Sequence, residues 1–439
     1  MNDKKQIRAW CLYDFGNSAF ATTILAAVLP TYFSQVIYKG GSSATAVWGI
    51  ITTIAMLIVA VGSPILGAIS DSANAKKKFW AFFMAVGCIA TAFFFFPGPG
   101  DTLFLSVVFI IANIGFTGSL VFYDAFLPHI VSRDRMDKVS AAGYAWGYIG
   151  GGILLVINMI MIMNPGSIFG EGDPGHLGIR LSFVSVSVWW ILLPMFKRIH
   201  EKTLNDAPKK AAADAIRDGA RQLISTFRQI SQYKELFKFL IAYFLYIDGV
   251  GTIIRMATVF ASDPKLGLTN HLAGLTGGML DMTMVMALGL LITQIVAWPM
   301  SFVFGRIGQK KGAKNTIYIC IVAYTIIAIL GTFMFADWNF LVLAALVGTV
   351  QGGIQAMSRS LFAHMIPKEH SGEFFGFFGI FEKFASILGP LLMSLVALLT
   401  DNVRFSVLAV IPLFVIGGLV LIGVKTPDTR LKPLEKTEA

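Results

Sequence analysis

Long apolar runs separated by short polar segments dominate this chain. Each run meets or approaches the roughly 20 residues that a helix needs to cross a bilayer. The runs are continuously apolar instead of alternating between apolar and polar positions, which excludes a β-barrel. We therefore predict an all-α membrane protein with twelve transmembrane helices, at about 9–36, 46–70, 79–96, 102–127, 140–163, 180–197, 236–261, 275–304, 314–335, 339–364, 373–399 and 403–424.

Composition supports this class. The 439 residues are 56% hydrophobic and only 14% charged, whereas soluble domains carry about 25% charged residues. The mean hydropathy is +0.71. The formal charge of +10 is spread over short basic clusters between the apolar runs. This distribution indicates a lipid bilayer as the partner and argues against nucleic acid, because no basic domain is present.

Basic residues also predict the orientation. Of the 35 Lys and Arg residues, only Lys39, Arg180, Lys265 and Arg404 fall in segments expected outside when the N-terminus is in the cytoplasm. Both termini are therefore expected to be cytoplasmic. The first apolar run is too long for a cleaved signal and reads as a retained helix. Short external segments without an Asn-x-Ser/Thr sequence favour the bacterial inner (cytoplasmic) membrane.

The longest polar segment divides the chain into two sets of six helices. We expect an N-terminal six-helix bundle at 1–197, a cytoplasmic linker at 198–235, a C-terminal six-helix bundle at 236–424 and a cytoplasmic tail at 425–439. Apolar residues in the linker recur at helical spacing with arginines between them. This pattern predicts an amphipathic helix on the inner leaflet, with a solvated linker helix as the alternative.

The two bundles repeat one another in sequence. Leu12-Tyr-Asp-Phe-Gly16 resembles Leu245-Tyr-Ile-Asp-Gly249, so that Asp14 and Asp248 are 234 positions apart. The same offset aligns the end of the second helix, with Gly67 and Asp71, to the end of the eighth, with Arg306 and Gly308. Two features that share one offset predict pseudo-symmetric halves. Such parallel repeats are typical of secondary transporters that bind substrate between them.

Several stretches resemble the major facilitator superfamily. The two copies of the loop after the second helix of each half resemble its signature, although Ser72 stands where Arg is usual and Gly305 where Asp is usual. The stretches LYDFGNSAFATTI, FYDAFLPHI, YIDGVGTIIRMA and QGGIQAMSRSLFAHMIP look like the branch that contains the autophagy-related vacuolar amino-acid effluxers and their bacterial relatives. The resemblance implies a secondary transporter that works by alternating access, with amino acids among its expected substrates.

In superfamily members the first, fourth, seventh and tenth helices line a central cavity, and here each of them carries one stripe of polar residues. The spacings within each stripe put its members on a single helical face. Because lipid cannot satisfy such groups, the stripes are expected to face protein or water. The candidate residues for substrate binding or coupling are Asp14, Asn17, Ser18, Asn113, Asp248, Arg255, Gln351, Gln355 and Arg359.

Helix rise separates these residues by depth. Asp14, Asp124 and Arg359 are expected to gather in the cytoplasmic third as a charged gate, and Asp248 to lie near the midplane as the substrate or proton contact. For each of these charges, an internal ion pair remains the structural alternative. The candidates for gating or conformational change are Gly67, Asp71, Asp124, Arg306 and Gly308.

These candidates favour transport of a small polar solute. A cavity with charges of both signs suits amino acids or related zwitterions, and proton coupling through Asp248 or Asp14 is a further hypothesis. An exporter of amphipathic compounds or organic anions, and a membrane receptor, remain alternatives. The sequence has no catalytic motif, so we expect no enzyme, no cofactor and no metal. We also expect a monomer, with Cys11, Cys88 and Cys320 as buried small side chains.

Overall fold

The structure is a computed structural model that describes residues 2–38, 43–73, 75–163, 176–192, 221, 233–261, 266–277, 280, 282–385, 388–400 and 402–427. The secondary structure of these residues is helical, apart from an isolated bridge between Thr269 and Ala336. Within the described residues, nine helices are long and apolar enough to cross a membrane, and Leu177–Ile191 and Leu388–Thr400 are shorter apolar helices. The all-α prediction is confirmed, whereas twelve separate crossings stay a prediction.

The N-terminal half begins with a composite helix. Asp3 caps its start, because the carboxylate accepts a hydrogen bond of 2.9 Å from the backbone N–H of Lys5. The helix then runs through α1 (Lys4–Ala19), the π-helix η1 (Phe20–Ala27), the short α2 (Leu29–Tyr32) and a second π-helix, η2 (Phe33–Ile37). The other elements of this half are α3 (Ser43–Ser72), α4 (Lys76–Phe93), α5 (Thr102–Ile130), the 3-10 helix η3 (Arg133–Arg135), α6 (Met136–Met163) and α8 (Leu177–Leu192).

The C-terminal half has one interrupted helix. Its elements are α10 (Lys234–Ala261), α11 (His271–Leu275), α12 (Met282–Lys311), α13 (Ala313–Gly331), α14 (Asp337–Met365), the 3-10 helix η7 (Lys368–His370), α15 (Ser371–Phe384), α16 (Leu388–Thr400), α17 (Val403–Ser406), the 3-10 helix η8 (Val407–Val410) and α18 (Ile411–Ile422). The predicted run 373–399 is thus divided between α15 and α16. Between α12 and α13 the chain turns sharply at Gly312, whose φ of +88° favours glycine.

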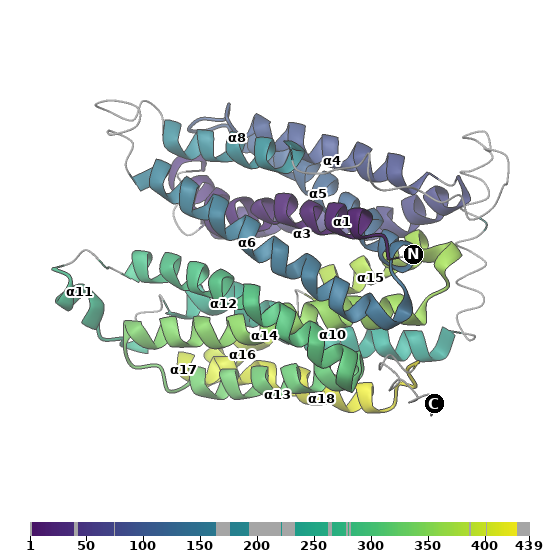
Figure 1. Cartoon of the computed structure of the whole chain (residues 1–439). Coiled ribbons are helices and arrows are strands. Elements are labelled where there is room, and N and C mark those ends of the chain that lie inside the picture. The colour runs from purple at the N-terminus through teal and green to yellow at the C-terminus, as the bar shows by residue number, and fades with distance from the viewer. Residues whose placement is uncertain are drawn as a thin grey trace.

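The two halves form two layers of roughly parallel and antiparallel helices (Figure 1). The N-terminal half lies above the C-terminal half in that view, with α6, α12, α14 and α15 at the boundary. The start of α1 and the end of α18 lie at the same end of the molecule, on the right. We refer to this end as the inner end, and to the opposite end as the outer end.

The halves pack against each other along two seams, α3 with α15 and α6 with α12 and α14. Glycine permits the close approach in both. A Cβ on Gly376 would lie 2.7 Å from the Cα of Pro64, and a Cβ on Gly305 would lie 2.7 Å from the Cβ of Ala141. Any larger residue at either position would push the halves apart.

Two of the predicted segments fall mainly where the structure gives no description. The amphipathic linker at 198–235 lies outside the described residues except for 221 and 233–235. The tail at 425–439 is described only as far as residue 427.

Candidate functional site

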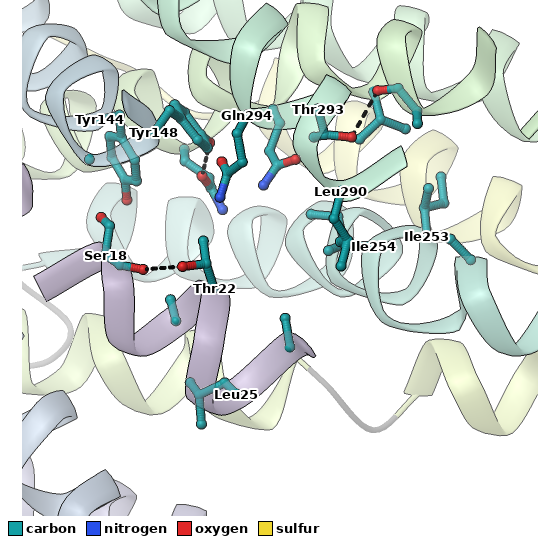
Figure 2. Close-up of a pocket in the computed structure, with 18 of the residues that line it drawn as sticks. Ser18, Thr22, Leu25, Tyr144, Tyr148, Ile253, Ile254, Leu290, Thr293 and Gln294 are labelled. Atoms are coloured by element: carbon teal, nitrogen blue, oxygen red, sulfur yellow. Dashed lines mark hydrogen bonds between the residues drawn. The ribbon is translucent and has the colours of Figure 1, made fainter. Parts of the chain in front are cut away.

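A cavity of about 440 Å³ lies between the two halves. Its walls come from α1, η1, α5 and α6 on one side and from α10, α12, α14 and α15 on the other. Figure 2 shows Ser18 and Thr22 of the first helix facing Tyr144, Tyr148 and Gln294 across this space. Much of the remaining wall is apolar, and its residues include Leu25, Phe116, Ile253, Leu290, Phe340 and Leu343.

Polar groups in the wall form contacts within and between the halves. The hydroxyl of Tyr148 in α6 donates a hydrogen bond of 2.8 Å to Oε1 of Gln355 in α14, and this bond is drawn in Figure 2. Two buried amide atoms, Nδ2 of Asn17 and Oε1 of Gln351, have no hydrogen-bond partner among the described residues. Because a buried polar group without a partner is costly, these two side chains are suited to a ligand that satisfies them.

The structure brings most of the predicted stripe residues to this cavity. Seven of the predicted residues line it: Asp14, Asn17, Ser18, Asp124, Gln351, Gln355 and Arg359. Asn113, Asp248 and Arg255 are not among the described lining residues. Asn113 instead accepts a hydrogen bond of 3.3 Å from Thr117, which does line the cavity. Arg255 has an exposed side chain on α10.

A charged cluster closes the inner end of the cavity. The Nη1 atom of Arg359 lies 3.0 Å from Oδ1 of Asp124 and 3.6 Å from Oδ2 of Asp14. The guanidinium also donates hydrogen bonds of 3.0 Å to the hydroxyl and 2.7 Å to the carbonyl oxygen of Ser140. The hydroxyl of Tyr123 donates a bond of 2.8 Å to Asp14. The cluster therefore ties α14 of the C-terminal half to α1, α5 and α6 of the other half.

Three aromatic rings surround the same guanidinium. The Cζ atom of Arg359 lies 4.3 Å from the ring centroid of Tyr144, 4.8 Å from that of Trp10 and 5.6 Å from that of Tyr123. Cations are attracted to the faces of such rings at these distances. The side chain of Arg359 is only 3% exposed, so ion pairs, hydrogen bonds and rings together replace its hydration.

Asp71 forms a second contact between the halves at the inner end. Its carboxylate accepts hydrogen bonds from the backbone N–H groups of Gly372 and Glu373, at 3.1 and 2.8 Å. It also pairs with the buried ammonium of Lys76 at 2.6 Å. A carboxylate at a helix N-terminus is favoured by the helix dipole, so Asp71 holds α15 of the opposite half. Gly67 packs directly against the backbone of Gly372.

The corresponding corner around α12 uses different residues. A Cβ on Gly308 would lie 3.2 Å from the Cβ of Asp137 in α6, while the side chain of Arg306 is exposed. Asp137 accepts a hydrogen bond of 2.5 Å from Ser360 and lies 3.7 Å from His364. At this corner the acidic side chain therefore comes from α6 of the N-terminal half.

Asp248 lies at the interruption of the broken helix. Its Oδ2 accepts a hydrogen bond of 3.0 Å from the backbone N–H of Gly389, near the start of α16, and its Oδ1 accepts one of 3.4 Å from Thr252. The residue is fully buried. Asp248 therefore stabilises the N-terminus of a helix within its own half.

The sequence reasoning missed several members of these contacts. Glu382, to which no role is assigned from the sequence, lines the cavity. The sequence reasoning also did not single out Ser140, Asp137 or His364. Asp124 and Arg359 are 235 positions apart, as are His129 and His364. This offset is one residue longer than the 234 of the internal repeat, so the partners of the central ion pair lie close to equivalent positions without sharing its register.

Comparison with known proteins gives one family. The family model described as "Vacuole effluxer Atg22 like" matches residues 43–431. The "Uncharacterized MFS-type transporter YxiO" of Bacillus subtilis is 39% identical over 424 residues, which are 95% of this chain and 94% of that protein. "Autophagy-related protein 22" of Yarrowia lipolytica is 27% identical over 69% of this chain and 53% of its own length.

Solved structures of the major facilitator superfamily share the fold. The human organic anion transporter MFSD10 matches with a TM-score of 0.68 at 12% identity, over 96% of this chain and 100% of that one. The proton:xylose symporter XylE matches with a TM-score of 0.66, also at 12% identity, over 97% of this chain and 96% of that one. At such identities the likeness concerns the arrangement of helices.

Proposed function

This chain belongs to the Atg22-like vacuole effluxer family, a branch of the major facilitator superfamily, and on that premise we propose that it moves amino acids or related zwitterions by alternating access. The chain is an integral, multi-pass transporter of the superfamily type. The observation that carries the proposal is the cavity, because both halves contribute polar groups to it and a charged cluster closes its inner end.

The chemistry of the cavity supports a zwitterionic substrate. The carboxylates of Asp14, Asp124 and Glu382 line the wall. Asp14 and Asp124 contact Arg359 in this structure, so an ammonium group would contact them where it replaces that guanidinium. A substrate carboxylate can accept a hydrogen bond from the unsatisfied Nδ2 of Asn17, and the unsatisfied Oε1 of Gln351 can accept one from the substrate ammonium. The apolar wall accommodates a side chain. A few convergent polar groups in an otherwise apolar pocket are typical of small-molecule sites.

Counterflow in proteoliposomes tests this proposal. Purified protein is reconstituted and offered labelled neutral, cationic and acidic L-amino acids in turn. We expect exchange of at least one class, weakened by Gln351→Leu, which removes an amide from the cavity. Asn315→Leu makes the same kind of change at an exposed amide outside the cavity and is the matched control. Absence of exchange for every amino acid would reject this substrate class.

Organic anions or amphipathic compounds are the second candidate. The human neighbour in fold is named an organic anion transporter, and the apolar part of the wall suits amphipathic molecules. Against anions, Arg359 is the only basic residue among the described lining residues, and two carboxylates already contact it. Counterflow of a labelled organic anion that amino acids do not inhibit would favour this alternative.

Several further features belong to the same proposal. We place the inner end in the cytoplasm of a bacterial cell, with the protein in the inner membrane and acting as a monomer. The proposed division is two six-helix bundles, at 1–197 and 236–424, joined by the linker at 198–235 and followed by the tail at 425–439. The basic residues between the helices support this orientation.

Proton coupling is part of the proposal and has its own test. Asp14 lines the cavity. Asp248 of α10 is not among the described lining residues, and its carboxylate contacts the start of α16. We expect Asp14→Asn to reduce accumulation driven by a pH gradient while substrate exchange at equal pH continues. Full accumulation by both Asp14→Asn and Asp248→Asn would reject coupling through these carboxylates.

A further inference from the structure

The partners named for the Arg359 guanidinium all belong to the N-terminal half. They are the carboxylates of Asp14 and Asp124, the hydroxyl and carbonyl oxygens of Ser140, and the rings of Trp10, Tyr123 and Tyr144. We call these six residues the guanidinium box. Arg359 itself belongs to α14 of the other half, and its side chain reaches across the boundary between the halves into the box.

The box remains with α1, α5 and α6 if the halves separate at the inner end. Separation would withdraw Arg359 and leave the two carboxylates without the cation that now lies between them. Two neighbouring carboxylates without a cation repel each other, and this repulsion favours a cation that enters in place of Arg359. The geometry of the box indicates which kind of cation fits.

We propose that the vacated box binds the guanidinium or primary ammonium group of a small organic cation, which takes the place of Arg359. This inference rests on the alternating access proposed above. Asp14, Asp124 and Tyr144 also line the transport cavity, so a solute in the cavity reaches the box directly. The bound cation stabilises the state that is open at the inner end, because Arg359 occupies its site in the closed state.

The surroundings favour an organic cation over a metal ion or a proton. Three ring faces within 5.6 Å attract a polarisable cation. The two oxygens of Ser140 accept separate N–H donors of one planar fork. In the described part of the chain, no group of three or more His, Cys, Asp or Glu side chains could hold a metal ion. A proton bound to one carboxylate would make no contact with the ring faces or with the carbonyl oxygen of Ser140.

Distance measurements between the halves test the proposal. Spin labels are attached to Arg135→Cys in η3 and Glu369→Cys in η7, both of which are exposed at the inner end of opposite halves. The buried native cysteines, Cys11, Cys88 and Cys320, are replaced by alanine. Methylguanidinium is the probe, and methylurea is its uncharged counterpart of similar shape. Both are added at millimolar concentration to the full-length protein at constant ionic strength.

We expect methylguanidinium to increase the population with the longer distance, and methylurea to leave the distribution unchanged. Asp124→Asn should raise the methylguanidinium concentration needed for half of the response at least about tenfold, because it removes one charge from the box. Asp71→Asn should strengthen the response, since it weakens a separate contact of the closed state and leaves the box intact.

A second measurement uses a box that is vacant in every state. Arg359→Ala removes the internal guanidinium, and methylguanidinium should then raise the thermal midpoint of unfolding where methylurea does not. If Arg359→Ala does not fold, Arg359→Met provides the variant, because methionine keeps much of the side-chain volume and leaves the carboxylates of the box without a cation.

The outcomes separate this inference from the proposed function. Opening that responds to acid but not to methylguanidinium would overturn the organic-cation site and leave alternating access in place. An equal response to methylguanidinium in the wild-type protein and in Asp124→Asn would also overturn the site. A distance that stays fixed under every condition, in a protein that shows no counterflow, would reject alternating access itself.

Discussion

Asp14 and Asp248 occupy the same position in the two sequence repeats, yet their carboxylates serve different contacts. Asp14 contacts Tyr123 of its own half and Arg359 of the opposite half, at the closed inner end of the cavity. Asp248 contacts Thr252 and the backbone of Gly389, both within its own half. One carboxylate therefore belongs to an interface that opens in the proposed transport cycle, and the other to an interruption inside a single half.

This difference shows what a repeat does not preserve. Equal register does not keep the surroundings of a side chain, because Asp14 lines the cavity and Asp248 is absent from its described wall. It does not keep the partner either, since a partner depends on which helix lies opposite. The two carboxylates differ because, of the two, only Asp14 takes part in a described contact between the halves. If the contrast is correct, changes at the Asp14 contact affect opening at the inner end, whereas changes at Asp248 leave that opening unchanged and lower stability.

The largest effect is expected for Arg359→Gln. The change leaves Asp14 and Asp124 buried without their cation, and removal of one partner of a buried pair costs about 3–5 kcal/mol. Thermal unfolding of the purified protein measures the loss. The double variant Asp124→Asn with Arg359→Gln should recover part of it, because one unpaired charge is removed. A wild-type midpoint in Arg359→Gln would show that the cluster is unimportant for stability.

The next effect concerns Asp71, which caps α15 from the opposite half. Asp71→Asn removes the charge that pairs with Lys76 and accepts two backbone N–H groups. We expect the closed state to lose about 1.5–3 kcal/mol, the range for hydrogen bonds to charged groups. Labels at Arg135→Cys and Glu369→Cys should report more of the open population. Asp101→Asn, at the exposed start of α5, is the control.

Asp248→Ala provides the contrasting result. Loss of a capping side chain costs about 0.5–2 kcal/mol, so the thermal midpoint should fall. The distance between the halves at the inner end should stay that of the wild type, because Asp248 contacts its own half only. A shift in that distance would remove the distinction between the two repeat-related carboxylates.

The smallest effect is expected for Tyr148→Phe. This change removes a neutral hydrogen bond between the halves, from Tyr148 to Gln355, and such bonds contribute about 0.5–1.5 kcal/mol. The open population should rise less than in Asp71→Asn. Equal opening in the two variants would mean that charge does not determine the strength of the contacts between the halves.

The sequence predicts the fold well because apolar runs and their repeat are local signals. The all-α class and the two halves follow from them, and the stripes place Asp14, Asp124 and Arg359 at one end of the cavity. The partners were harder to predict. Nothing along the chain indicates that Asp137 approaches Ser360, since this contact forms only when the halves pack. The break before α16 does have a signal, Gly389-Pro390, but that pair equally indicates close packing of an unbroken helix.

The π-helix η1, at Phe20–Ala27, changes the direction in which side chains of the first helix face. An α-helix turns by about 100° per residue, and a π-helical turn takes in one residue more than an α-helical turn. Residues beyond Phe20 are therefore displaced around the axis relative to a regular α-helix drawn through Asp14. Loss of one residue here would restore regular geometry and rotate the outer part of the helix against its neighbours. The number of residues in this segment therefore determines which faces of the outer part of the helix meet its neighbours.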